Sequence, residues 1–408
     1  MNIRPILSTL LRHRTAATLI VLEIALSCAI ICNALFLIAE RIDAVSRPSG
    51  IADQELLHIR LSGIGPTENA DARTREDIAA LRAVPGVAAV TMTNQFPFSG
   101  SASNSTLTLT PEQERASLVV ATYQGHEDLV QTLGIRLAAG RDFRPDEFMD
   151  ATALEQMTDF STLSSPVIVS ASIAEKLFPG ESALGRTVYM GPVPLTIIGV
   201  AEALTKPHAA GSGNMTDSLI VPVRLNYTNG GSYMVRVTDP ARRDEVLAAS
   251  VAALEKVGPN RLVIDRQSYS EIRDRFFGSD REMIVLLIVV SIALLVVTAL
   301  GIVGLASFWV QQRTRQIGVR RALGATRSQV LRYFQTENFL LTTIGIAVGM
   351  LLAYALNLYL MGEYELPRLP LAYLPAGAVV LWVLGQVAVL GPARRAALVP
   401  PAIATRSA

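Results

Sequence analysis

The sequence predicts an α+β membrane protein. Four transmembrane helices, one followed much later by three, carry a large two-lobed α/β extracytoplasmic domain. Three observations predict this class: apolar runs long enough to cross a bilayer, arginines confined to the segments beside those runs, and a βαβ pattern that occurs twice in the long intervening segment. Half of the 408 residues are hydrophobic, as expected when part of a chain lies in lipid.

Four apolar runs define the predicted spans. A helix rises about 1.5 Å per residue, so roughly 20 residues cross a hydrocarbon core about 30 Å thick. The last three runs contain no Asp, Glu, Lys or Arg over 26, 23 and 21 consecutive residues. The predicted transmembrane helices are residues 16–40, 282–309, 338–360 and 371–391.

The distribution of charge predicts the orientation of these helices. The tails 1–15 and 392–408 and the loop 310–336 together carry twelve arginines and no acidic residue, whereas 41–281 carries 29 acidic and 23 basic residues. Short positively charged segments stay in the cytoplasm. We therefore expect a multi-pass protein of the cell inner membrane, with both tails and the 310–337 loop cytoplasmic and the 41–281 domain periplasmic.

The few polar groups within the spans predict helix packing. Cys28 and Cys32 are four residues apart on one face of the first span, and we expect them to pack between helices. Glu23 is expected to be protonated or paired near the inner interface. Helix–helix hydrogen bonds are predicted for Asn33, Asn357 and Gln386. Gly345 and Gly349 form a GxxxG pattern in the third span, which is a possible dimer contact.

The extracytoplasmic segment contains the order strand, helix, strand twice. The expected elements are strand 55–62, helix 73–83 and strand 87–92, and then strand 233–238, helix 241–257 and strand 261–265. Two βαβ units commonly share one sheet, as in ferredoxin-like folds. We expect a first lobe formed by residues 50–120 and 230–265, with residues 121–229 inserted as a second lobe.

The inserted lobe has its own expected elements. These are helix 125–134, strand 166–170, helix 171–178 and strand 194–202. The stretch 144–165 is acidic and rich in Ser and Thr, and 209–218 is rich in Gly and Ser, so both are expected to be loops.

The chain carries no motif of an enzyme. GxxxxGK[ST], HExxH, CxxC and GxSxG are all missing from the sequence, and its four histidines are far apart. We therefore expect a non-catalytic membrane subunit with no catalytic residue, metal site or cofactor of its own, and with no nucleic-acid partner.

The cytoplasmic loop carries the one distinctive surface pattern. Apolar and arginine residues alternate at helical spacing, so one helix face holds Ile317, Val319, Ala322 and Leu323 and the other holds Arg315, Arg320, Arg321 and Arg327. Two interpretations remain open: a helix at the membrane surface with arginines near anionic lipid, or a docking helix for a cytoplasmic partner. Gly318 and Gly324 favour docking, because small residues permit close approach and Gly324 can end the helix with positive φ.

Four motifs in order resemble those of one family. The segment RTRQIGVRRALGAT (313–326) resembles the cytoplasmic signature of MacB/FtsX-type ABC transporter permeases. The stretches LGIRLAAGRDF (133–143) and PVIVSASIAEKLFPGESALGRTV (166–188) resemble motifs of the family's periplasmic domain, and PARRA (392–396) resembles its C-terminal tail. Together with the one-plus-three spans, the resemblance covers essentially the whole chain.

The resemblance implies a mechanism and partners. Such permeases pair as dimers and bind two cytoplasmic ATPase subunits, which hold ATP and Mg²⁺. ATP-driven movement would then pass to the periplasmic domain and drive efflux through an adaptor and an outer-membrane channel. The first lobe would correspond to the family's porter lobe. The implied ATPase-coupling residues are Arg313, Arg315, Ile317, Gly318, Arg320, Arg321, Ala322, Leu323, Gly324 and Ala325.

Two departures from the family pattern stand out. Gln312 and Gln316 replace the usual Glu, which suggests altered complementarity to the ATPase or an asymmetric pair with a paralogous permease. The chain begins about 15 residues before its first span, so the ATPase is expected on a separate polypeptide. Three other readings stay open: an FtsX-like regulator of an envelope enzyme, a lipoprotein-release permease, and an envelope scaffold without an ATPase.

Overall fold

The computed structural model describes residues 14–400 except 65–68, 101–102, 159, 161–162, 209–214, 229, 259–260 and 365–367. It divides into two compact units, one formed by Ser46–Ser279 and the other by the segments Met1–Val45 and Asp280–Ala408. Each unit has its own hydrophobic core, and we describe them in turn.

The first sheet of the Ser46–Ser279 unit confirms the predicted ferredoxin-like pseudo-repeat. Its four antiparallel strands have the order β13-β1-β12-β2. The elements are β1 (Leu56–Gly63), α3 (Ala70–Arg82), β2 (Val87–Met92), β12 (Gly230–Val237), α7 (Arg243–Val257) and β13 (Arg261–Ser268). Each pattern of strand, helix and strand supplies two of the four strands. The second copy thus completes a sheet that the first copy cannot form alone.

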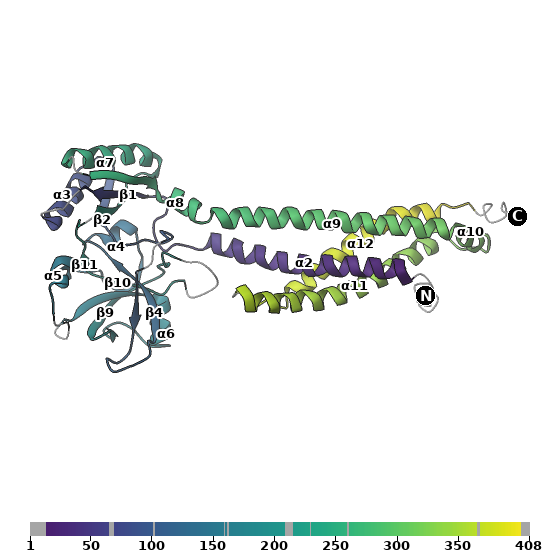
Figure 1. The fold of residues 1–408 in the computed structure, drawn as a ribbon, viewed down its shortest axis with the longest axis horizontal. Coiled ribbons are helices and arrows are strands. Elements are labelled where there is room, and N and C mark those ends of the chain that lie inside the picture. The colour runs from purple at the N-terminus through teal and green to yellow at the C-terminus, as the bar shows by residue number, and fades with distance from the viewer. Residues whose placement is uncertain are drawn as a thin grey trace. The chain divides into compact units, whose positions relative to one another are not determined.

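Helices α3 and α7 cover one face of this sheet (Figure 1). Ile78 and Leu81 of α3, with Leu254 of α7, pack against Leu57 and Ile59 of β1. Strand side chains alternate between faces, so the intervening His58 points to the other side, where its Nε2 lies 3.0 Å from Ser232 Oγ. The apolar residues that recur at helical spacing in α3 and α7 and in alternation along β1 therefore pack in one core.

The second sheet has seven strands in the order β3-β4-β10-β7-β9-β5, with β8 paired to β9. Its strands are β3 (Asn104–Leu107), β4 (Leu118–Gln124), β5 (Leu137–Gly140), β7 (Ser165–Ser170), β8 (Thr187–Met190), β9 (Val193–Ala201) and β10 (Ser218–Val221). Helix α6 (Ala171–Leu177) packs on β7 and β9 of this sheet, whereas the short α4 (Leu129–Leu133) contacts β2 and β12 of the first sheet. The strands predicted at 166–170 and 194–202 and the helix at 171–178 are therefore present.

Three expectations for this lobe were wrong. The inserted lobe begins with β3 and not at residue 121, because β3 and β4 pair in the second sheet. Helix 125–134 is reduced to the short α4. The stretch 144–165 is not simply a loop: it holds the 3₁₀ turn η1 (Pro145–Glu147), strand β6 (Met149–Asp150), which pairs with β11 (Val223–Arg224), and helix α5 (Ala151–Glu155). The expected loop 209–218 lies largely outside the described residues.

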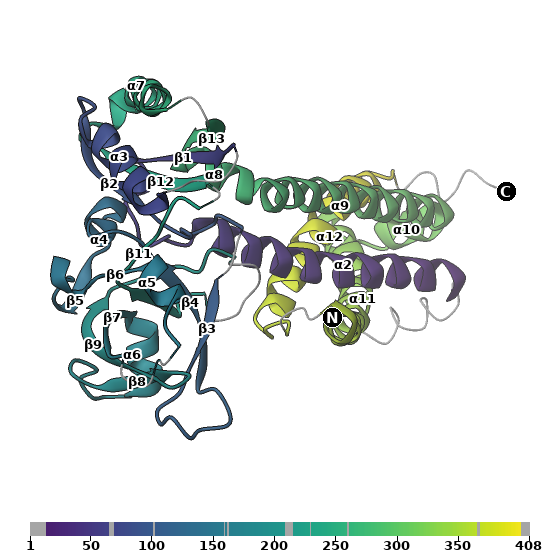
Figure 2. The same cartoon turned by 60° about the vertical axis from the view of Figure 1, so that its left-hand side comes forward.

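The other unit holds four helices long and apolar enough to cross a membrane. They are α2 (Arg14–Ser46), α9 (Gly278–Gln312), α11 (Arg327–Tyr364) and α12 (Tyr373–Ala397), and they lie side by side in both views (Figures 1 and 2). The first three extend beyond their predicted spans at both ends, whereas α12 begins at Tyr373, inside the predicted span, and ends beyond it. At one end of the unit, Arg41 of α2 and Asp280 of α9 form an ion pair.

Helix α2 lies at the centre of this unit. Of the most apolar 18 residues of each helix, 61% are buried in α2 but only 6% in α9. Cys28 and Cys32 are fully buried free thiols, which confirms their packing role. Asn33 of α2 donates from Nδ2 to the carbonyl of Ala353 in α11 (3.1 Å), so the predicted helix–helix hydrogen bond is present. The side-chain hydrogen bonds of Asn33 thus lie inside the helix bundle.

Candidate functional site

The candidate site is the short helix between α9 and α11. Helix α10 (Thr314–Ala322) follows α9 after Arg313, and Gly324 at φ +96° turns the chain into α11. No atom would crowd a Cβ at Gly324, so the positive φ alone accounts for the glycine. The prediction that Gly324 ends this helix is confirmed.

One face of α10 is packed against the membrane helices. Ile317 is buried in a small core with Val330 and Phe334 of α11 and with Ala393 and Ala396 of α12. Gly318, beside it, is buried as well. Ile317 thus shares one buried apolar cluster with residues of both long helices.

Two arginines of the expected docking set make internal contacts instead. Arg313 is 8% exposed, and its Nη1 lies 3.0 Å from both carboxylate oxygens of the buried Glu337. Its guanidinium also lies over the ring of Trp309, 5.7 Å from the centroid. Arg321 donates from Nη1 to the carbonyl of Val399, 2.6 Å away. The guanidinium groups of both arginines are therefore engaged within the chain.

Glu337 is the residue that sequence reasoning missed. It directly follows the acid-free segment 310–336 and precedes the third predicted span. A lone carboxylate at the start of an apolar run needs a partner, and that signal pointed to one of the nearby arginines. The segment contains six arginines, and the sequence does not indicate which of them pairs with Glu337, because that depends on the fold.

The opposite face of α10 is exposed. Leu323 is 83% and Val319 45% exposed, and Arg315 lies on the same side one helical turn from Val319. Arg320 is exposed too, with its guanidinium 5.2 Å from the ring centroid of Tyr333. The remaining members, Ala322 and Gly324, are exposed and Ala325 is half-buried. The ten predicted coupling residues therefore divide into an inner anchoring face and an outer face.

The two glycines of the GxxxG pattern lie inside the chain. A Cβ added at Gly345 would come within 2.8 Å of Ile24, and one at Gly349 within 2.5 Å of Cys28, both in α2. The expectation of a dimer contact is wrong for this structure, because α2 occupies that face. The small residues serve close packing of α11 on α2.

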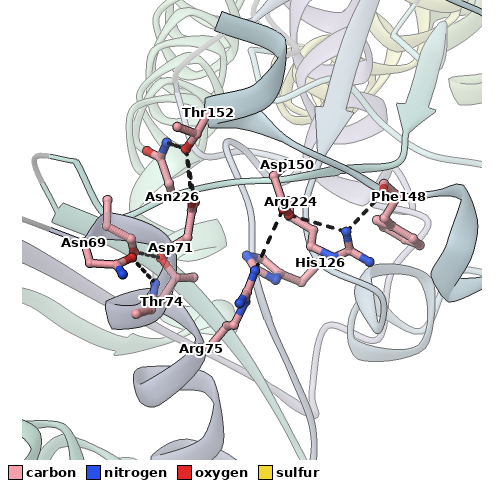
Figure 3. Close-up of polar contacts among 12 residues, drawn as sticks. Asn69, Asp71, Thr74, Arg75, His126, Phe148, Asp150, Thr152, Arg224 and Asn226 are labelled. Carbon is pink, nitrogen blue, oxygen red and sulfur yellow. Dashed lines mark hydrogen bonds and ion pairs between the residues drawn. The ribbon is translucent and has the colours of Figure 1, made fainter. Parts of the chain in front are cut away.

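A second polar cluster joins the two lobes of the extracytoplasmic unit (Figure 3). Thr152 of α5 donates to Asp71 of α3 (3.0 Å to Oδ2) and accepts from Asn226 (2.9 Å). Arg75 of α3 forms an ion pair with Asp150 of β6. We call these contacts the interlobe cluster; they connect α3 of the first lobe to α5 and the two-stranded β6–β11 sheet, which pack against the core of the second lobe.

Arg224 of β11 organises the second half of this cluster. It donates from Nε to Glu127 (2.6 Å) and from Nη1 to the carbonyl of Phe148 (3.1 Å). Burial by itself would raise the pKa of Glu127, but the hydrogen bond from Arg224, a backbone hydrogen bond and the nearby charges of Arg224 and His126 together lower it. No group of three or more metal-ligating side chains occurs among the described residues.

Comparison with known proteins gives two family matches. Residues 17–253 match the MacB-like periplasmic core domain, and residues 288–401 match the FtsX-like permease C-terminal domain. The two matches are separated by residues 254–287, which include the start of α9.

Full-length relatives cover the chain to different extents. The macrolide export ATP-binding/permease protein MacB of Shewanella sp. strain ANA-3 is 28% identical over 72% of this chain, which spans only 43% of that relative. The uncharacterized ABC transporter permease YknZ of Bacillus subtilis strain 168 is 25% identical over 82% of this chain and 79% of its own length.

Two solved structures resemble the extracytoplasmic part. The extracellular domain of the transporter YknZ from Gram-positive bacteria covers 51% of this chain at 19% identity and a TM-score of 0.32. The periplasmic region of MacB from Actinobacillus actinomycetemcomitans covers 57% at 16% identity and a TM-score of 0.33. Because its two domain matches together account for most of its length, this multi-pass membrane protein belongs to the family of MacB/FtsX-type ABC transporter permeases.

Proposed function

We propose that this chain is the permease subunit of an export system, and that a separate cytoplasmic ABC ATPase docks on the outer face of α10. The observation that carries the proposal is the exposure of Leu323 and Val319 on a short helix whose inner face is anchored in the membrane unit. Burying one Leu side chain contributes about 1.5–3 kcal/mol, so Leu323 can serve as the main apolar contact.

The charges of the outer face indicate the chemistry of the docking groove. Arg315 and Arg320 are exposed, and Gln312 and Gln316 stand uncharged beside them. Residues 310–336 contain no acidic residue. A groove with acidic side chains around an apolar pocket would complement this face, since arginine forks pair well with carboxylates. The ATPase would bind ATP and Mg²⁺.

The inner face provides the route for motion. Ile317 packs on both α11 and α12, and the central α2 contacts α11 through Gly345 and Gly349. Movement of α10 would thus reach the centre of the unit. In the proposed orientation both termini and α10 are cytoplasmic, and residues 46–279 lie on the far side of the membrane.

The remaining partners follow from the proposed role. The apolar and largely exposed surface of α9 would face lipid and a second permease, either another copy or a paralogue. By analogy with relatives named for macrolide export, the ATPase cycle would drive efflux through a periplasmic adaptor and an outer-membrane channel. The interlobe cluster would keep the two lobes together during that movement.

The test is a substitution on the outer face with a matched control. Leu323→Glu places a charge in the proposed apolar contact, and we expect it to abolish both recovery of an ABC ATPase with the tagged permease from native membranes and the ATP hydrolysis of the eluate. Leu398→Glu makes the same change at another exposed leucine (59% exposed) near the end of α12. Mass spectrometry identifies the recovered chains.

Equal recovery of the ATPase with both variants would refute docking on the outer face. Recovery of no ATPase with the unsubstituted protein would refute the transporter role and favour a scaffold. A cell-wall hydrolase among the recovered chains would point to an FtsX-like regulator.

A further inference from the structure

A cavity of about 540 Å³ opens between α10 and the first turns of α11, within the membrane unit. Its lining is both basic and apolar, and we call it the α10–α11 cavity. The residues that define its chemistry are Arg313, Arg320, Arg332, Ile317, Tyr333 and Phe334. It lies between α10 and α11, and its lining includes Arg320 and Gln316, which also border the docking face formed by Leu323 and Val319.

All the charged side chains that line this cavity are positive. Three arginines and no acidic residue line it. Glu337, the nearby carboxylate, is already engaged by Nη1 of Arg313. Within the described part of the chain, Nη2 of Arg313 has no hydrogen-bond partner although it is buried. An anion beside Arg320 and Arg332 would therefore meet net positive charge without competition.

The apolar wall indicates that the anion belongs to an amphiphile. Ile317, Val330 and Phe334 line the same cavity, and the ring of Tyr333 lies beneath the guanidinium of Arg320. A free phosphate ion gains nothing from such a wall. A phospholipid does, because its phosphate is followed by glycerol and acyl carbons.

The position along α11 agrees with this ligand. The cavity-lining residues of α11 lie 4–9 positions before residue 338, where the third apolar run begins. At 1.5 Å per residue this is roughly 6–14 Å from the hydrocarbon boundary. The head-group layer is roughly 5–8 Å thick on each side of a bilayer. The inner end of the cavity thus lies at the height of lipid phosphates.

We propose that the α10–α11 cavity binds the head group of one anionic membrane phospholipid. Arg320 and Arg332 would contact the phosphate, and the apolar wall would hold the glycerol and the first acyl carbons. A lipid bound there would set the angle of α10 against α11. The lipid would bind without a docked ATPase, although Arg320 and Gln316 belong to both sites.

The test uses the full chain, purified in mild detergent, delipidated and titrated with phosphatidylglycerol or phosphatidylcholine under native mass spectrometry. We expect one tightly bound phosphatidylglycerol per chain. Arg320→Gln with Arg332→Gln should weaken it about 30-fold, since each basic residue near an anionic lipid contributes on the order of 1 kcal/mol. The matched control is Arg315→Gln with Arg327→Gln, two exposed arginines of the same segment outside the cavity lining.

Equal weakening in both double variants would overturn the proposal, because it would indicate a general attraction of the basic segment to anionic lipid. Unchanged binding in the cavity variant would overturn it as well. Displacement of the lipid by millimolar inorganic phosphate, but not by sodium chloride of the same ionic strength, would reassign the cavity to free phosphate. An unfolding temperature equal to that of the unsubstituted protein controls for loss of structure.

Discussion

Arg313 and Glu337 show how strongly a single contact can redefine a residue. A charge buried without a partner costs several kcal/mol, and removal of one member of such a pair typically destabilises a protein by about 3–5 kcal/mol. Both side chains here are at least nine-tenths buried. Arg313 therefore holds α11 to the start of α10, whereas Arg315, two residues later, is exposed and available for docking.

His58 gives the extracytoplasmic domain a defined response to acid. Burial lowers its pKa to about 4 from the ordinary 6.5, against the raising influence of Asp265. Between pH 6.5 and 4 the unfolded chain binds a proton that the folded chain refuses, so stability falls as the pH drops through this window and is unaffected by His58 above it.

We expect residues 46–279, produced as a soluble domain, to lose about 2 kcal/mol of unfolding free energy through His58 between pH 7 and pH 5. His58→Gln should remove that part of the pH dependence, measured by urea unfolding with circular dichroism. His208→Gln, at an exposed histidine, should leave the pH dependence as it is. An identical loss in the His58 variant and the unsubstituted domain would contradict the assignment.

At the scale of elements, glycines determine how closely helices approach α2. Gly345 and Gly349 of α11 and Gly377 of α12 each leave no space for a Cβ, because atoms of α2 lie within 2.8 Å of where it would be. A Cβ at Gly301 of α9 would likewise come within 2.4 Å of the carboxylate oxygens of Glu23 in α2. In a membrane the hydrophobic effect contributes little to helix association, because lipid is as apolar as the helix side chains. Close van der Waals packing is therefore a main source of stability for the helix bundle.

Gly349→Ala should destabilise the membrane unit, since its Cβ would lie 2.5 Å from Cys28 Cβ. Overpacking typically costs about 1–3 kcal/mol, which corresponds to roughly 5 °C in unfolding temperature. The fluorescence of the two tryptophans reports this, as both Trp309 and Trp382 lie in the membrane unit. Gly304→Ala is the control, because nothing lies within 4 Å of its Cβ position. A shift from dimer to monomer without loss of stability would restore the dimer role of the GxxxG.

At the scale of the whole molecule, the orientation in the membrane is the decisive property. A cysteine at Ser182 should react with a membrane-impermeant maleimide added to intact cells, because that residue is exposed in the extracytoplasmic unit. A cysteine at Ser328 should react only after permeabilisation. The native Cys28 and Cys32 are fully buried and should stay silent. The reverse pattern at the two positions would invert the proposed topology.

The sequence by itself determined the features that depend on local or periodic patterns. Apolar length set the four candidate spans, residue periodicity set the two βαβ units, and Gly324 marked the end of α10 because positive φ is a property of one residue. A shared sheet was predicted as well, since two such units readily complete one sheet, and the structure gives its order β13-β1-β12-β2.

Only the tertiary structure decided which partners distant residues choose. The arginines of the 310–336 segment are chemically alike, so pairing of Arg313 with Glu337 and of Arg321 with Val399 depended on the packing of α10 on α11 and α12. Strand β4 joined the second sheet by pairing with the distant β10, and β3 followed by pairing with β4. Gly349 faced α2 instead of a second copy. A sequence pattern constrains the local backbone conformation of its own segment. Contacts between distant segments depend on how the side chains of the whole chain pack together in the core.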